Sequence, residues 1–213
     1  MRAFWYLALV LSSCASLQKK EVYKDLYMDI QYNKKALEIG TWMADSIKFT
    51  RVQFYIGHVQ LYNETKMIYA LPKSYTLINL EKNLILGKIP SNLKYDKIQM
   101  ELGVDSATNC QGALSNDLDP INGMYWTWQS GYINTKIEGV SPWALRGEFV
   151  YHLGGYQKGQ YAMQTIEIHS KGNKINLDLK SAINRKQIIS QSNLMTPGDS
   201  AIKISQEIKK AFY

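Results

Sequence analysis

The segment 103–139 holds the densest set of residues that could take part in binding or chemistry. Its central stretch reads GMYWTWQSGY over residues 123–132. If this stretch is a strand, Met124, Trp126 and Trp128 project from one face, because side chains two positions apart share a face. Two indoles and a thioether on one face form either a heavy core layer or the wall of a binding site. Composition alone favours the core layer.

The chain has three histidines, and one of them lies in a strand-like stretch after this segment. His152 shares its strand face with Val150, and we expect that face to point inward. His58 and His169 are the other two, and none of the three has the local spacing of a metal-binding pair. Imidazole with a thioether such as that of Met124 would suit a soft metal such as copper. The alternative is that His152 is a core residue with satisfied hydrogen bonds.

Other classes of site are weakly represented. Oxygen atoms gather at Asp117 and Asp119, which makes calcium a candidate ligand, although Asp-x-Asp before Pro-x-Asn-Gly is also typical of a turn. The sequence contains no Gly-x-Ser-x-Gly motif, no phosphate-binding glycine loop and no readable nucleophile–base pair, so we do not expect an enzyme. The net charge of +7 is scattered and forms no basic stripe with interleaved aromatics, which argues against nucleic-acid binding.

The first fourteen residues indicate export and lipid attachment. Nine apolar residues, 3–11, are too few to span a bilayer of roughly 30 Å, which favours a signal peptide over residues 1–13. The tetrapeptide LSSC that ends at Cys14 matches the lipobox of bacterial lipoproteins, in which this cysteine is acylated. We therefore expect a lipidated cysteine and tether over 14–24 that holds the protein to the outer or inner membrane, in the periplasm or at the surface. Cys110 then lacks an internal disulfide partner, and we expect it to be buried as a small apolar residue.

The elements that must position these residues are mainly strands. Alternating apolar residues separated by turn residues predict strands over 26–32, 47–62, 77–80, 98–104, 124–137, 145–153, 161–169 and 175–179. The apolar phase changes near Arg51, which predicts a bulge. Asp199 is expected to cap a C-terminal helix that ends near Lys209-Lys210. We predict one all-β domain over 25–213, an antiparallel β-sandwich with one short C-terminal helix.

Several blocks of the sequence resemble the MbnP-like family. They are GVD at 103–105, DLDP at 117–120, NGMYWTWQSGY at 122–132, KIEG at 136–139, FVYHLGG at 149–155, and MTPG at 195–198 before a helix that finishes in Phe212. The tryptophan block is the specific one, and the blocks run in family order over nearly all of the predicted mature chain. The resemblance implies a copper-linked β-sandwich in the periplasm or at the cell surface.

In this family, histidines and a tryptophan oxidised to kynurenine bind copper, and a di-haem peroxidase-like partner performs the oxidation. The resemblance assigns His152 to the family's histidine and Trp126 or Trp128 to its tryptophan, and we expect His58 and Met124 as further members of the site. Two departures concern ligand positions: Trp128 stands where copper-binding relatives have a histidine, and Ser192-Asn193-Leu194 occupies the stretch before MTPG where relatives often have one. The expectation is a non-enzymatic, membrane-anchored lipoprotein that binds or handles copper in the cell envelope. The alternative is an interaction module for a partner or glycan that keeps the fold without a complete metal site.

Overall fold

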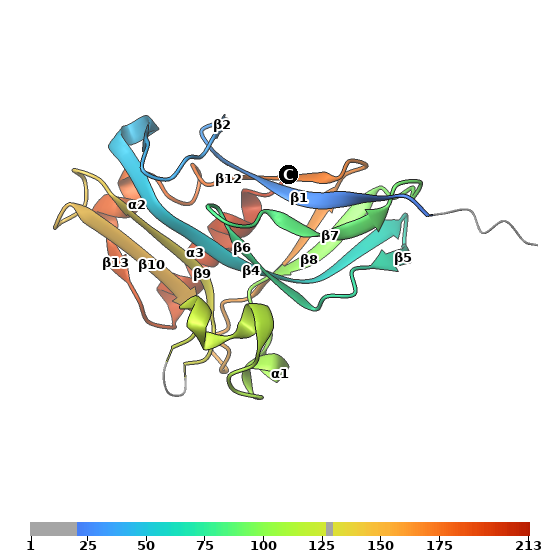
Figure 1. The fold of residues 1–213 in the computed structure, drawn as a ribbon. Helices are drawn as coiled ribbons and strands as arrows, with labels where there is room; N and C mark the ends of the chain where they lie inside the picture. Colours follow the sequence, from blue (N-terminus) through green and yellow to red (C-terminus); the bar gives the residue numbers. More distant parts are fainter. Residues whose placement is uncertain (1–20, 127–129) are drawn as a thin grey trace, which may run out of the picture.

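Two β-sheets pack against each other in the computed structural model, which describes residues 21–126 and 130–213 (Figure 1). Within these residues the smaller sheet has four strands, in the order β12-β1-β2 with β7 also paired to β1. Their bounds are β1 Tyr23–Tyr32, β2 Lys35–Ala36, β7 Ile85–Pro90 and β12 Lys174–Asp178. The alternation expected over 26–32 is therefore confirmed, and β1 begins two residues before the predicted domain boundary at residue 25.

The larger sheet has nine strands within the same described ranges. Its order is β11-β8-β4-β9-β10-β13, and β3, β5 and β6 also pair with β4. The bounds are β3 Trp42–Met43, β4 Ile47–Asn63, β5 Lys66–Ala70, β6 Tyr75–Asn79, β8 Lys97–Leu102, β9 Ile133–Val140, β10 Glu148–Gly154, β11 Gln164–His169 and β13 Asn193–Leu194. The predicted all-β sandwich is confirmed, but it is not wholly antiparallel, because β1 pairs with β12 and β10 with β13 in parallel. The shorter strands β2, β3, β5, β7 and β13 were not predicted.

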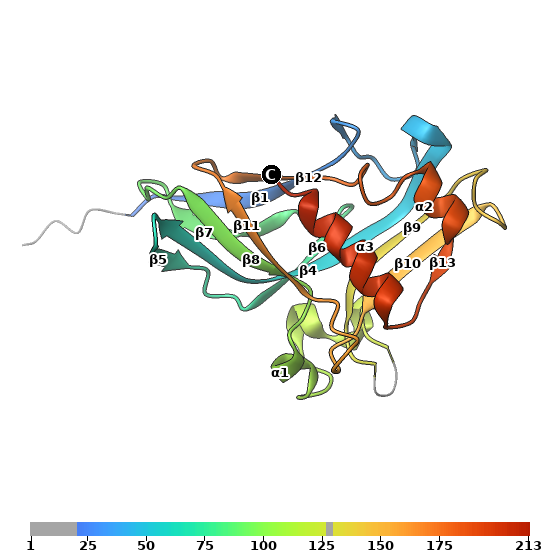
Figure 2. The same ribbon diagram turned by 180° about the vertical axis from the view of Figure 1, so that it is seen from behind.

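Helix α3, Asp199–Lys210, packs against β10 and β11, which lie on opposite sides of β4 in the larger sheet (Figure 2). Ala201, Ile204 and Ile208 form its buried face. The predicted C-terminal helix is confirmed, but Gly198 is its N-cap and Asp199 lies in the first turn. The remaining helical segments are α1 Ser106–Asn109, α2 Arg185–Ser190, and the 3₁₀ turns η1 Ala44–Ser46, η2 Asn116–Leu118 and η3 Pro120–Asn122. No helix over 21–126 or 130–213 has the length and apolar character needed to cross a membrane.

The central strand β4 carries two bulges that change which of its side chains face the core between the sheets. Ile47 and Phe49 are buried there before the first register shift, which lies between Phe49 and Arg51 opposite β9. After this shift, even-numbered residues such as Phe54 face the core. A second register shift, opposite β8, reverses the alternation again, so that odd-numbered residues such as Val59 face the core. The predicted bulge near Arg51 is confirmed, and the second bulge was missed.

The expected strand over 124–137 is wrong in its first half. β9 begins only at Ile133, and Tyr125 makes a single antiparallel bridge with Tyr132. Trp126 N–H donates to Gly131 O at 2.9 Å, so the chain has folded back on itself before β9 starts. Gly131, at φ +71°, adopts the left-handed conformation that this reversal uses. The alternating pattern therefore ran across a reversal of the chain.

Cys110, expected to be buried, is exposed at the end of α1. Its helix lies on the side of the larger sheet away from β1, where the chain is in contact with solvent (Figure 1). The side chain therefore makes no contribution to the core.

Substituting Gly139 in β9 should destabilise the fold. A Cβ atom there would lie 2.5 Å from the backbone oxygen of Lys48 and would also overlap the ring of Phe149. Gly139→Ala is expected to lower the free energy of unfolding by about 1–3 kcal/mol, because backbone cannot move aside as a flexible side chain can. Gly172→Ala is the control, since its nearest neighbour would be Ser170 Oγ at 4.0 Å. Equal free energies of unfolding for the two variants, measured by chemical denaturation, would contradict the predicted overlap at Gly139.

Candidate functional site

We call residues 103–126 and 130–132 the covering segment, which lies against part of the outer face of the larger sheet, opposite the core between the sheets (Figure 1). This segment and the sheet together bury a second apolar cluster, which we call the outer cluster. The Tyr55 hydroxyl of β4 donates to Asp117 O at 3.1 Å and so fixes the covering segment to the sheet, while the Tyr132 hydroxyl donates to Leu118 O at 3.0 Å within that segment. The buried members of the outer cluster are Tyr55, Tyr75, Val104, Leu118, Met124, Tyr132 and Ile133.

Met124 and Trp126 both pack against the outer cluster, but they differ in exposure. Met124 is fully buried, so its thioether lies in an apolar interior, and Trp126 is only partly buried. Trp128 lies outside the described residues. Residues 124–126 form no strand, so the predicted common strand face is wrong for Met124 and Trp126 and is not tested for Trp128. Met124 takes the core position that composition favoured.

The indole of Trp126 lies against Gly154 at the end of β10. A Cβ atom at Gly154 would be 2.7 Å from Trp126 Cζ3, so the ring occupies the space that glycine leaves open. His152 is two positions earlier on the same strand, roughly 7 Å away along the backbone, and its side chain projects from the same face. The structure thus places Trp126 of the block GMYWTWQSGY against Gly154, two positions from His152 in the block FVYHLGG.

His152 faces away from the core between the sheets. Phe149, Tyr151 and Leu153 point into that core, so the alternate positions Val150 and His152 belong to the outer face. We expected Val150 and His152 to point inward, and for the core between the sheets this expectation is wrong. The His152 side chain is nevertheless only 14% exposed on that face.

A carboxylate orients the His152 ring. Nε2 lies 2.7 Å from Glu138 Oε1, and the other oxygen of Glu138 lies 3.5 Å from Arg51 Nε. Because an ionised carboxylate only accepts hydrogen bonds, Nε2 carries the proton and Nδ1 carries the lone pair. Nδ1 has no hydrogen-bond partner within 21–126 and 130–213. A histidine held by a carboxylate through one nitrogen, with the other nitrogen open, has the arrangement of a metal-binding histidine.

Burial keeps this imidazole neutral. Desolvation lowers the pKa of His152, the hydrogen bond to Glu138 partly opposes that shift, and the positive charge of Lys136 lowers the pKa further. Lys136 itself is nearly buried and donates through Nζ to Gly123 O. The neutral form is the one that binds a metal ion.

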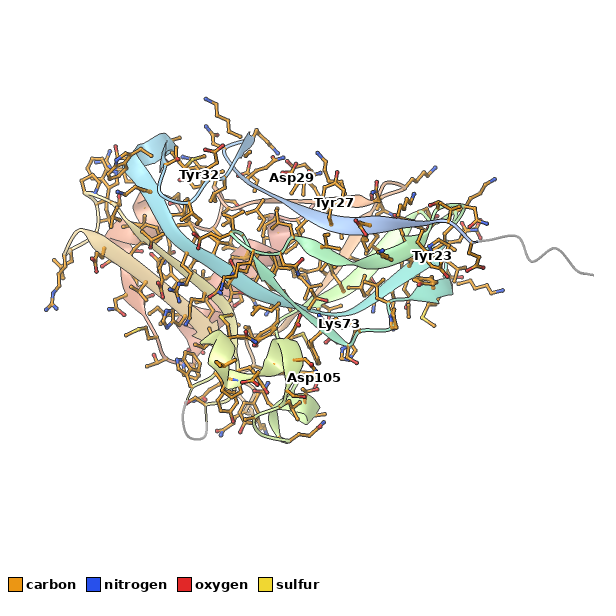
Figure 3. All side chains as sticks on the ribbon, in the orientation of Figure 1. Tyr23, Tyr27, Asp29, Tyr32, Lys73 and Asp105 are labelled. Atoms are coloured by element: carbon orange, nitrogen blue, oxygen red, sulfur yellow. The ribbon has the colours of Figure 1, made fainter. Side chains whose placement is uncertain are left out.

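His58 lies in a different cluster. It occupies the second bulge of β4 with φ +46°, and its Nδ1 lies 2.8 Å from Glu101 Oε2 and 4.0 Å from Asp105 Oδ2. Tyr75 contacts both sides of this group: its ring packs edge-on to the imidazole at 4.9 Å, and its hydroxyl donates to Asp105 Oδ2 at 2.5 Å. Figure 3 shows Asp105 beside α1, on the side of the molecule away from Tyr27 and Asp29. We call His58, Glu101 and Asp105 the His58 cluster.

The two histidines cannot share one ion. His152 is opposite Lys136, which is opposite Gln53, and His58 lies five positions beyond Gln53 on β4. Two strand spacings and five residues of rise place their backbones roughly 15–20 Å apart. A site that combines His58 with His152 is therefore excluded by the register, and each remains a candidate ligand of its own site.

The carboxylates of Asp117 and Asp119 are used by the fold. Asp117 Oδ2 accepts from Lys73 Nζ at 2.6 Å and from Leu77 N at 2.7 Å. Asp119 caps the turn η3 through Ile121 N at 2.9 Å. These contacts favour the turn interpretation over the calcium site considered from the sequence.

The sequence did not identify Glu138, Arg51, Glu101 or Asp105 as site residues. Glu138 and Asp105 lie within the blocks KIEG and GVD, but nothing in the linear order indicates which histidine each one meets. The sequence did indicate that Lys136 and Glu138 share a strand face, because they are two positions apart. The pairing register of β4, β9 and β10 was needed to place Glu138 beside His152.

Comparison with known proteins gives two matches. The family model MbnP matches residues 21–205. The solved structure of MbnP from Methylosinus trichosporium is similar with a TM-score of 0.61 and 14% identity, over 86% of this chain and 83% of that one. At that identity the structural likeness shows the shared fold. No curated protein matches the chain.

The neutral state of His152 should appear in the pH dependence of stability. The unfolded chain binds a proton on this histidine at about pH 6.5. The folded protein binds it only at lower pH because the pKa is lowered, so folding loses stability as pH falls through that interval. The free energy of unfolding of the wild type relative to His152→Gln is expected to decrease between pH 7.5 and pH 5, measured by urea denaturation. A difference that does not change with pH would contradict a buried neutral imidazole.

Proposed function

Because the chain belongs to the MbnP family, we propose that it is a membrane-anchored lipoprotein that binds or handles copper in the cell envelope. Membership of this family supports a copper-related role and an extracytoplasmic location. The proposal includes the membrane as a partner through a lipid on Cys14, and a di-haem peroxidase-like protein as the partner that the resemblance implies. The proposed role is binding and not catalysis.

The observation that carries the proposal is the position of Trp126 beside the end of β10, near His152. The Trp126 ring lies on Gly154, two positions from His152, and Nδ1 of the imidazole has no hydrogen-bond partner among the described residues. Imidazole is a suitable ligand for copper, and a neutral imidazole does not have to lose a proton before it binds the ion. The donor chemistry of this face therefore fits a copper ion, which His152 would hold beside the Trp126 indole.

Glu138 and Arg51 are the positioning residues of this site. Glu138 fixes the tautomer of His152 through Nε2, and Arg51 balances the charge of Glu138 from the neighbouring strand. The low exposure of the His152 side chain limits water at the ring. Met124 is not part of this proposal, because its sulfur lies within the outer cluster.

A second candidate function, binding of a glycan or other polar partner, is favoured by one observation. A polar cavity on the same face is lined by residues of β4 and β6 and by the turns that follow Ser115. Gln53 lines it, is nearly buried, and its Oε1 has no hydrogen-bond partner within the described parts of the chain. An unsatisfied buried acceptor is costly, and a hydroxyl of a bound sugar would satisfy it.

Removing His152 should weaken copper binding. His152→Ala is expected to lower the affinity for Cu(I), measured by competition with a chelator, by an order of magnitude or more. His169→Ala is the matched control, since His169 lies at the exposed end of β11. If His152→Ala lowers the melting temperature and leaves copper affinity unchanged, His152 is a structural residue and the copper proposal fails at this site.

Removing the lipid attachment residue should release the protein from the membrane. Cys14, which lies outside the described residues, is the expected acylation site, and acyl chains on one residue provide a stable anchor. Cys14→Ser is expected to move the protein from the membrane fraction to the soluble fraction of lysed cells. Cys110→Ser should stay with the membrane, and retention of the Cys14 variant there would place the anchor elsewhere.

A further inference from the structure

We propose that the His58 cluster is a second metal site that binds a divalent transition-metal cation of the Zn²⁺ class through His58 Nδ1, Glu101 and Asp105. The three potential ligand atoms all lie within 4.8 Å of one another. The register places this cluster far from His152, so the site is independent of the proposed copper function.

The distances are close to those of a bound ion. Ligand atoms about 2.1 Å from a tetrahedral zinc ion lie about 3.4 Å from each other. In the His58 cluster, Nδ1 is 2.8 Å from Glu101 Oε2 and 4.0 Å from Asp105 Oδ2. Each separation differs from the tetrahedral value by less than about 1 Å, which rotation of side chains can supply. One nitrogen and two carboxylate oxygens form a donor set that zinc commonly accepts.

The three ligands come from separate elements that the fold holds in place. His58 stands in the second bulge of β4, where the register shift directs its side chain outward to Glu101 of β8. Asp105 is fixed through its other oxygen, Oδ1, which caps α1 by accepting from Thr108 N at 2.6 Å. Tyr75 contacts both His58 and Asp105. The arrangement is therefore pre-formed and needs little ordering when an ion binds.

The charge of the cluster also indicates a cation. Within residues 21–126 and 130–213, the ion-pair partner of Glu101 and of Asp105 is His58, and neither meets a lysine or arginine. By contrast, Glu138 beside His152 is paired with Arg51. Two carboxylates that share one imidazole leave negative charge uncompensated, and a divalent ion would neutralise it.

The site has room to complete its coordination. The side chain of His58 is 40% exposed, and those of Glu101 and Asp105 are each 23% exposed. Water can therefore occupy the remaining position that a three-ligand zinc site keeps open. The proposed ligand is a cation taken directly from solution.

The test titrates Zn²⁺ into the metal-free, full-length protein in detergent, followed by calorimetry, and repeats the titration with Co²⁺ followed by visible absorption. One ion per chain is expected. Glu101→Gln should weaken Zn²⁺ binding at least tenfold, because the amide is a poor ligand but keeps the hydrogen bond to His58. Glu167→Gln, an exposed carboxylate on the neighbouring strand β11, should leave it unchanged.

The conformation of His58 calls for a second variant. His58→Ala places a residue with little tolerance for φ +46° in the bulge, whereas asparagine adopts this conformation readily. His58→Asn should therefore keep the melting temperature near that of the wild type and still lose Zn²⁺ affinity at least tenfold. His152→Ala should retain Zn²⁺ binding, which separates this proposal from the copper proposal. Absence of a stoichiometric site in the wild type, or equal affinity in His58→Asn and the wild type, would overturn the inference.

Discussion

The register of β4 against its neighbours is the constraint on which the rest of the structure depends. This strand of 17 residues pairs with β3, β5, β6, β8 and β9. A shift of one residue would turn every buried side chain to the opposite face. Two bulges are therefore not defects: each moves the apolar phase by one position, so that Phe49, Phe54 and Val59 all reach the same core.

The same bulges create the outer face on which both candidate sites lie. The first bulge brings Arg51 of β4 opposite Glu138 of β9, and Glu138 orients His152 on the adjacent strand β10. The second bulge projects His58 towards Glu101. Between the sites, the outer cluster holds the covering segment against the sheet through apolar contact and through the Tyr55 hydroxyl. Disruption of this cluster would therefore disturb both sites together.

The two histidines share a design and differ in environment. Each is held by a glutamate across the sheet, His152 by Glu138 and His58 by Glu101. The His152 side chain is 14% exposed and its glutamate is balanced by Arg51, whereas His58 is 40% exposed beside a second carboxylate. A neutral imidazole near an indole suits a soft ion, and an imidazole with two carboxylates suits a harder one. The sites are therefore expected to discriminate between metals by donor type.

The sequence by itself determined the all-β class, most of the longer strands and the bulge near Arg51. It also determined the C-terminal helix and the family. All of these depend on apolar periodicity or on short sequence blocks, which are local properties of the chain. It also pointed to His152 and Trp126. It could not determine their surroundings: Glu138 reaches His152, and Glu101 and Asp105 reach His58, only through the pairing of strands distant in the chain. The same limit explains the error over 124–137, where alternation continued across a reversal that only the pairing of Tyr125 with Tyr132 reveals. Periodicity reports which residues share a face, and tertiary hydrogen bonding decides which faces meet.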